Sequence, residues 1–254
     1  MKLRVLGCSG GIGGDLRTTA FLLDDDVLID AGTGVGNLSL LELSKIDHVF
    51  VTHSHLDHVA CIPLLVDTVG YLRKRPVTVH ATDDTLDILR AHIFNWQVWP
   101  DFTAIPTALS PYLRFESHEV GAAVVLDGRS ITPISANHVV PAVGYHLDSG
   151  RRSLVYSGDT TGNPLLWDYL NGIENLRYLI IETAFPDKER DLAVASMHLC
   201  PSMLADELEG LKRRVEILIT HLKPGEAELT MREIDTRVGR FRPRMLVQGE
   251  SFDL

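Results

Sequence analysis

Residues 49–67 read VFVTHSHLDHVACIPLLVD. Its first three residues are apolar and predict the end of a strand, whereas the apolar run at 59–66 predicts a helix. Between them, positions 53–58 hold three histidines and one aspartate. The sequence therefore concentrates metal-binding types of side chain in the turn between a strand and a helix.

The spacing within this turn suits two ions. His53 and His55 are two residues apart and point to the same side of an extended backbone. Asp57 and His58 follow one helical step later and can face a second ion. A lone histidine at a helix start is more often a surface cap, but the HxHxDH pattern brings four ligands together. We therefore expect this turn to bind metal.

Length and charge narrow the range of partners. The chain has 254 residues, enough for one large α/β domain or two small ones, and a formal net charge of −10. The nearest thing to a basic stripe is 73–75, Arg-Lys-Arg, which reads as a solvated helix end. Long nucleic acid is therefore not expected as a partner, whereas a small anionic substrate at a metal is compatible with the charge.

Cysteine usage and hydropathy predict the compartment. Cys8, Cys61 and Cys200 are isolated and odd in number, which favours a reducing environment. The start of the chain, MKLRVLGCSGG, enters a strand at once and has no signal-peptide stretch, and no run is long enough to cross a membrane. We expect a cytoplasmic protein without a membrane partner.

Hydrophobic patterns predict two groups of strands with helices outside them, as two sheets packed face to face. An aromatic and proline-rich segment at 92–111 breaks the pattern and is expected to be an irregular insertion. The expected strands are 3–6, 18–23, 27–30, 50–52, 77–80, 124–126, 130–135, 143–147, 153–156, 178–181, 215–219 and 245–247. The expected helices are 63–72, one beginning at 82, 165–170, 201–211 and 226–238.

Three further ligand candidates follow apolar strands. His138, Asp159 and His221 each lie one to three residues past a predicted strand. Loops at strand ends gather functional residues, so the shared position places all three along one edge of the sheets. His118 and His146 are the strongest rivals to His138 as a ligand.

These motifs resemble those of the metallo-β-lactamase-fold hydrolases, and within them the class II 3′,5′-cyclic-nucleotide phosphodiesterases. The similarity lies in THSHLDHVACIPLL, IFNWQVWPDFT, MHLCPSML and ITHLKP, and it covers 3–224. Cys61 departs from the family's usual glycine or serine, which affects the expected helix packing and not the ligands. The resemblance implies one domain over 1–254 with a four-layer αββα sandwich fold.

The resemblance also implies a dinuclear metal site. His53, His55 and His138 would hold one ion, Asp57, His58 and His221 the other, and Asp159 would bridge them; Asp57 also belongs to the expected catalytic set. Two divalent ions suit in-line displacement at phosphorus. Imidazole with carboxylate favours zinc, and manganese and iron are alternatives.

A proton donor for the leaving group is expected at His198, because a related endonuclease family uses a histidine in this place, held by a glutamate. Glu182, at a strand end in LIIETAF, is the candidate partner that would keep the imidazole protonated. As an alternative, His198 caps the helix that follows. Asp30 either hydrogen-bonds a ligand histidine or is only a turn residue before Gly32.

The expected function is hydrolysis of the 3′ phosphoester of a cyclic nucleotide, with cAMP as the first candidate substrate. A tRNA 3′-processing endonuclease, a lactone or ester hydrolase, and a binding protein without turnover are the alternatives. Trp96, Trp99 and Phe102 in the insertion either pack, line a base pocket or form a homodimer seam. The segment GCSGGIGG after the first strand lacks the ending of a phosphate loop and is expected to be a tight turn.

Overall fold

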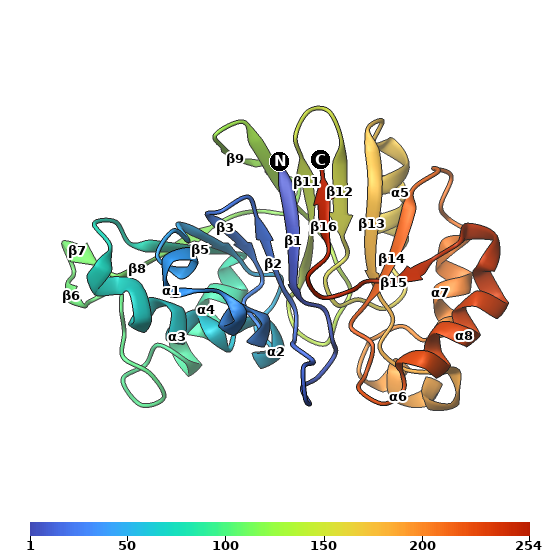
Figure 1. Ribbon diagram of the computed structural model, residues 1–254, viewed down its shortest axis with the longest axis horizontal. Coiled ribbons are helices and arrows are strands. Elements are labelled where there is room, and N and C mark those ends of the chain that lie inside the picture. Colours follow the sequence, from blue (N-terminus) through green and yellow to red (C-terminus); the bar gives the residue numbers. More distant parts are fainter.

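The computed structural model describes residues 1–254 and contains two seven-stranded sheets, which face each other in the centre of the molecule (Figure 1). The first sheet has the order β16 (Ser251–Asp253), β1 (Lys2–Gly7), β2 (Ala20–Leu23), β3 (Val27–Ile29), β4 (His48–Phe50), β5 (Val77–Ala81) and β8 (Leu113–Ser117). The second has the order β15 (Arg244–Met245), β14 (Glu216–Thr220), β13 (Leu176–Glu182), β12 (Ser153–Tyr156), β11 (Val143–Asp148), β10 (Arg129–Ser135) and β9 (Val124–Leu126).

Helices lie outside both sheets. The first half of the chain supplies α1 (Leu40–Leu43), α2 (Leu56–Val59), α3 (Cys61–Val69) and α4 (Asp83–His92). The second half supplies α5 (Pro164–Gly172), α6 (Arg190–Ala195), α7 (Pro201–Leu208) and α8 (Ala227–Val238). None of them combines the length and the apolar character that a bilayer crossing requires.

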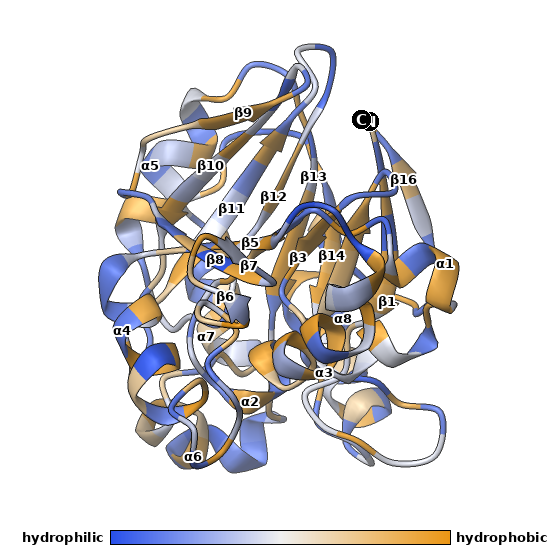
Figure 2. Cartoon of the chain, turned by 90° about the vertical axis from the view of Figure 1, so that its left-hand side faces the viewer, coloured by the Kyte–Doolittle hydropathy of each residue, from blue (hydrophilic) through white to orange (hydrophobic).

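Three apolar clusters separate the layers. One joins the first sheet to α3 and α4, a second joins the second sheet to α5, α7 and α8, and a third fills the space between the sheets. In the third cluster the rings of Phe21 and Tyr156 pack edge to face with centroids 5.0 Å apart. Apolar residues accordingly concentrate in the strands (Figure 2). The expected αββα sandwich is confirmed.

Most expected elements are present, with differences that have local causes. The helix expected at 63–72 is Cys61–Val69, because α3 follows α2 directly and Pro63 then falls in its first turn, where its missing N–H costs nothing. The strand expected at 245–247 is Arg244–Met245, and a further strand, Ser251–Asp253, follows it and pairs with β1. α1, α6 and β8 were also not expected.

The segment 92–111 is irregular apart from its first residue, which ends α4, and a two-stranded hairpin of β6 (Pro106–Thr107) and β7 (Ser110–Pro111). Phe102 is buried and Trp99 half-buried, and both pack on the first sheet's core cluster. Trp96 is 64% exposed. Two of the three aromatic residues therefore serve packing, and only Trp96 presents its ring to the surface.

Charged and polar groups also join the sheets. Arg129 in β10 donates to both carboxylate oxygens of Asp26, which precedes β3 in the first sheet, at 2.5 and 2.8 Å. Within the first sheet, His80 is buried, stacks on Phe50 with centroids 4.4 Å apart and shares a hydrogen bond of 2.9 Å with His48. Burial, with the neighbouring His48, lowers the pKa of His80 to about 3.

This buried histidine predicts acid sensitivity. Its pKa is about 3 in the folded chain and about 6.5 in an unfolded one. Between these values the unfolded state binds more protons, so stability falls as the pH falls. We expect His80→Phe to narrow the difference in unfolding free energy between pH 7 and pH 5 by about 2 kcal/mol, measured by urea denaturation. His92→Phe, which removes an exposed histidine, is the control; an equal effect of both changes would contradict the prediction.

Candidate metal centre

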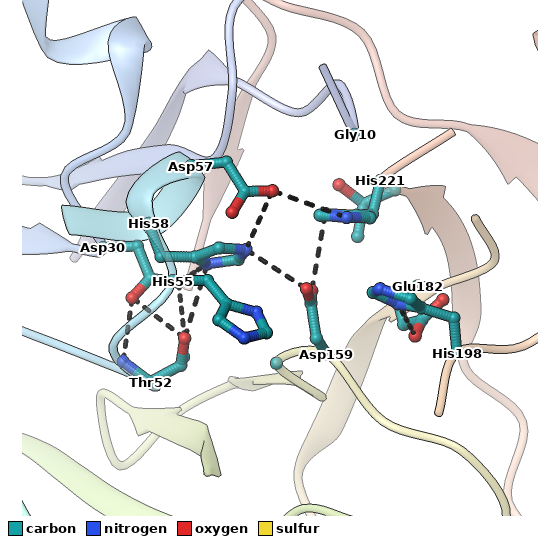
Figure 3. A network of polar contacts seen from close by, with 12 residues as sticks. Gly10, Asp30, Thr52, His55, Asp57, His58, Asp159, Glu182, His198 and His221 are labelled. Carbon is teal, nitrogen blue, oxygen red and sulfur yellow. Dashed lines mark hydrogen bonds and ion pairs between the residues drawn. The ribbon is translucent and has the colours of Figure 1, made fainter. Parts of the chain in front are cut away.

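The candidate ligands come from loops at one edge of the two sheets. Figure 3 shows Asp57, His58, Asp159 and His221 pointing toward one another. His53 follows β4 by three residues, His138 follows β10 by three, Asp159 follows β12 by three, and His221 directly follows β14. The structure thus confirms that these strand ends lie together. His55, Asp57 and His58 come from the turn and first residues of α2.

One group of donor atoms is formed by His53, His55 and His138, whose nitrogen donors all lie within 4.8 Å of one another. Nε2 of His138 is 3.3 Å from Nδ1 of His55. The other nitrogen of His138 donates to the carbonyl of Met197 at 3.1 Å, which fixes the tautomer so that Nε2 is the ligand atom. Three imidazoles arranged in this way can hold a divalent cation.

A second group is formed by Asp57, His58, Asp159 and His221. Asp159 lies between the two groups. Its Oδ2 is 3.3 Å from Nε2 of His58 and 3.7 Å from Nε2 of His53, and its Oδ1 is 3.4 Å from Nδ1 of His221. One carboxylate therefore reaches donors of both groups, the position that a bridging ligand requires.

Several atoms of this cluster are buried without a hydrogen-bond partner. They are Nε2 of His53, Nε2 of His58, Oδ1 of Asp159 and both ring nitrogens of His221. Buried polar atoms are normally paired, because an unpaired one costs about 1–3 kcal/mol. Since these atoms belong to neighbouring ligand-type side chains, they fit the donor set of metal ions.

The electrostatics of the cluster also favour a cation. Burial holds the pKa of His53 well below its usual range and lowers that of His221 to about 3, so both imidazoles are neutral, as metal ligands are. His58 differs: against the effect of burial, Asp159 and Asp30 raise its pKa well above the usual range. The two buried carboxylates thus draw positive charge to His58, and a cation at its Nε2 would meet the same requirement.

Asp30 orients His58 from behind. Its Oδ2 accepts from Nδ1 of His58 at 2.7 Å, while Thr52 donates to Asp30 through its backbone N–H at 2.8 Å and through its hydroxyl. The hydrogen-bonding interpretation of Asp30 is therefore confirmed. Thr52, which is also 3.0 Å from Nδ1 of His53, was missed, although its place directly before His53 in the motif was a signal.

His198 lies beside the cluster and is held by Glu182. Its Nδ1 donates to Oε1 of Glu182 at 2.8 Å, and Glu182 also accepts from the backbone N–H groups of Thr160 and Leu199. Burial opposes a charged imidazole, but the carboxylate outweighs this effect and raises the pKa of His198. Its side chain makes no cap hydrogen bond to α7, whose N-cap is Cys200. His198 also forms a possible donor group with His138 and Asp159.

The rival histidines lie elsewhere. His118 contacts the Tyr145 hydroxyl at 2.9 Å, and His146 contacts that of Tyr169 at 3.0 Å. Neither belongs to a group of potential metal ligands. Lys223, two residues after His221, donates to the carbonyl of Gly10 at 2.9 Å.

The glycine-rich segment after β1 packs against the cluster. His221 has a left-handed backbone, with φ of 62°, and its N–H donates to the carbonyl of Cys8 at 2.9 Å. A Cβ on Gly10 would lie 2.3 Å from the carbonyl oxygen of His221. The expected tight turn therefore has a further purpose, since only glycine lets the segment approach His221 this closely.

Known proteins share this fold and sequence pattern. The family model described as "Beta-lactamase superfamily domain" matches residues 25–238, so the chain belongs to that superfamily. It is 27% identical over 206 residues to a "Probable 3',5'-cyclic-nucleotide phosphodiesterase" of Yersinia pestis, covering 71% of this chain and 58% of the relative. It is 32% identical over 162 residues to a "Ribonuclease Z" of Halorubrum lacusprofundi, covering 60% and 49%. The chain thus spans about half the length of these curated relatives.

The metallo-β-lactamase fold protein YhfI from Bacillus subtilis superposes with a TM-score of 0.78 at 19% identity, covering 99% of this chain and 98% of that one. At this identity the likeness shows the fold alone. Fold and superfamily together define the class: the chain is a beta-lactamase superfamily protein with the metallo-β-lactamase fold.

The close approach of Gly10 to His221 gives a test of the site. We expect Gly10→Ala to displace His221, lower the bound-metal content and destabilise the chain by about 1–3 kcal/mol. The matched control is Gly36→Ala, because a Cβ there meets nothing within 4 Å. Elemental analysis and thermal melting measure both effects. Full metal content in Gly10→Ala would show that the segment does not position His221.

Proposed function

We propose that the chain is a dinuclear metal-dependent phosphodiesterase that cleaves the 3′ phosphoester bond of 3′,5′-cyclic nucleotides, with cAMP as the first candidate, to give 5′-nucleotides. The observation that carries the proposal is the pair of donor groups that meet at Asp159. Seven ligand-type side chains exceed what one ion can use.

The residues divide between two ions in this proposal. His53, His55 and His138 would hold one, Asp57, His58 and His221 the other, and Asp159 would bridge them. The donor set of imidazoles and carboxylates favours zinc, with manganese or iron as alternatives. When bound, such a pair supplies Lewis acidity and an activated water for displacement at phosphorus.

His198 would protonate the departing 3′ oxygen. Its Nδ1 is engaged with Glu182 at 2.8 Å, which leaves Nε2 for the substrate. The carboxylate of Glu182 orients the ring and stabilises the protonated form. Asp57, whose side chain is 30% exposed, is the carboxylate of the cluster with access to solvent, and we assign it to the catalytic set for this reason.

The substrate assignment is supported by the printed name of the Yersinia pestis relative and by the shape near the centre. A hollow of about 480 Å³ adjoins His138 and has a mixed polar and apolar lining, with Val120, Val139 and Pro141 among the apolar residues. This size suits a small molecule with an apolar base. We propose a small cyclic nucleotide as the partner, and neither long nucleic acid nor a membrane. We also propose that the protein is cytoplasmic and that it forms a homodimer through the exposed Trp96.

A second candidate is a tRNA 3′-processing endonuclease, which the similarity to the ribonuclease Z sequence favours. The net charge of −10 opposes it, because a polyanion is bound best by a basic surface. The two functions differ in substrate and share the same metal chemistry. Parallel assays on cAMP, cGMP, bis-(p-nitrophenyl) phosphate, a lactone and precursor tRNA therefore separate them.

We expect the metal-loaded chain to hydrolyse cAMP and to contain two ions. Asp159→Ala should retain less than about a tenth of the turnover, because a bridging carboxylate contacts both ions. Single alanine changes at His55 and His138 are the matched comparison and should cost less activity. Elemental analysis reports the ions per chain. A single ion in the saturated protein, or cleavage of precursor tRNA without cleavage of cAMP, would contradict the model.

The role of His198 can be separated from metal binding by changing the leaving group. General acid help is worth about 10²–10⁴-fold, so His198→Ala should lower cAMP turnover by that factor. A p-nitrophenyl phosphodiester should lose much less, because p-nitrophenolate leaves without a proton. Metal content is the control and should not change. Equal losses on both substrates with full metal content would rule out the acid, and a loss of metal would make His198 a ligand.

A further inference from the structure

A basic pocket lies at the opposite end of the second sheet from the metal centre. It encloses about 690 Å³ and brings together six of the chain's 24 lysines and arginines. Only one carboxylate, that of Glu216, lines it. The cations come from the start of β13, the loop before β14 and the 3-10 turn that follows α8: Arg177, Lys212, Arg213, Arg214, Arg240 and Arg242.

Carboxylates within the structure compensate only part of this group, because Arg240 forms an ion pair with Glu209 whereas half of the cations have no charged or hydrogen-bonding partner. The side chains of Lys212, Arg214 and Arg242 have no hydrogen bond or ion pair. Glu216 is engaged by Arg244, outside the pocket, at 2.9 Å, and is 4.0 Å from Arg177. Like charges gathered without partners repel one another, so the arrangement costs free energy that a bound anion would relieve.

Two of the arginines are ordered by aromatic rings. The guanidinium of Arg240 lies 4.8 Å from the ring centroid of Phe241, and that of Arg177 lies 5.5 Å from that of Tyr178. Leu211, Val215, Ile217 and Phe241 add an apolar lining. The pocket thus combines planar guanidinium donors, which match phosphate oxygens in pairs, with apolar surface.

The size and surroundings of the pocket favour a small ligand over a long polyanion. A volume of about 690 Å³ falls within the range of small-molecule sites. The rest of the surface is acidic, because the whole chain carries −10 despite these six cations. Arg177 is the second residue of β13, which ends at Glu182, so strand geometry puts the pocket roughly 15–20 Å from the metal centre.

We infer that this pocket is a second anion site, separate from the metal centre, that binds a small molecule carrying several phosphate groups. Its cations form hydrogen bonds to the phosphate oxygens, and Phe241 offers a face to a base if the ligand is a nucleotide. The inference does not depend on the function proposed for the metal centre.

The test is a calorimetric titration of the metal-loaded chain with inorganic triphosphate. We expect the double change Arg214→Ala and Arg242→Ala to weaken binding about tenfold or more, because it removes charge-assisted hydrogen bonds. The matched control is Lys74→Ala with Arg75→Ala, which removes two exposed cations elsewhere and should alter binding less than about twofold. Equal affinity in all three proteins would overturn the inference.

Two further arms identify the site and the ligand. Triphosphate also binds metals, so binding that persists in Asp159→Ala supports the pocket as its site. If this variant does not fold, the affinities of the unchanged chain and the two double variants, all metal-loaded, still decide whether the pocket binds triphosphate. ATP that binds more tightly than triphosphate, with the gain lost in Phe241→Ala, supports a nucleotide, and equal binding supports a ligand without a base. Single-stranded RNA that binds more tightly than both, and loses affinity in the same double variant, would overturn the small-molecule inference.

Discussion

The buried carboxylate of Asp159 is the constraint on which the site depends. It is 1% exposed, and an ionised carboxylate cannot remain in such a place without a positive partner. Its neighbours His53 and His221 are kept neutral by burial, which leaves His58 to carry positive charge between Asp159 and Asp30. One proton on His58 serves two buried carboxylates, and a metal ion at Nε2 would take the place of that proton.

The same cluster ties the two sheets together. Tyr145 of β11 donates its hydroxyl to the carbonyl of Val51 at 2.8 Å, and the N–H of Val143 donates to the carbonyl of Thr52 at 3.0 Å. On the other side, the carbonyl of Cys8 accepts from the N–H of His221. Each sheet therefore fixes a loop that belongs to the other half of the site. Because interiors are close-packed, a shift between the sheets would displace ligands from both donor groups.

Local sequence signals predict the candidate ligands, because each ligand lies in or directly after a short segment with a clear pattern. The HxHxDH turn and the strand ends before His138, Asp159 and His221 could be read from short apolar runs, and the structure brings all of them together. Pairing across the whole chain could not be read in this way. β16 is only three residues long and joins the sheet through β1, about 250 residues away, so nothing near Ser251–Asp253 indicates its partner.

Side-chain environments show the same limit. The sequence gives no indication that Gly10 will pack on His221, because the close approach arises only when β1 and β14 lie in facing sheets. The basic pocket was also missed. The most basic run in the sequence is 73–75, whereas the pocket draws its cations from three segments that are far apart in the chain.

Dissolved salt affects the two proposed anion sites differently, although β13 and β14 connect them. At the metal centre the charges are buried, so dissolved salt screens them weakly. In the basic pocket Lys212, Arg214 and Arg242 are exposed, and ions at physiological strength screen such charges beyond about 8 Å. Affinity in the pocket must therefore come from direct contacts with several phosphate oxygens, since long-range attraction is lost. A singly charged cyclic nucleotide offers few such contacts, whereas a polyphosphate offers many. Under the two proposals, this difference makes the basic pocket selective for the polyphosphate and leaves the cyclic nucleotide to the metal centre.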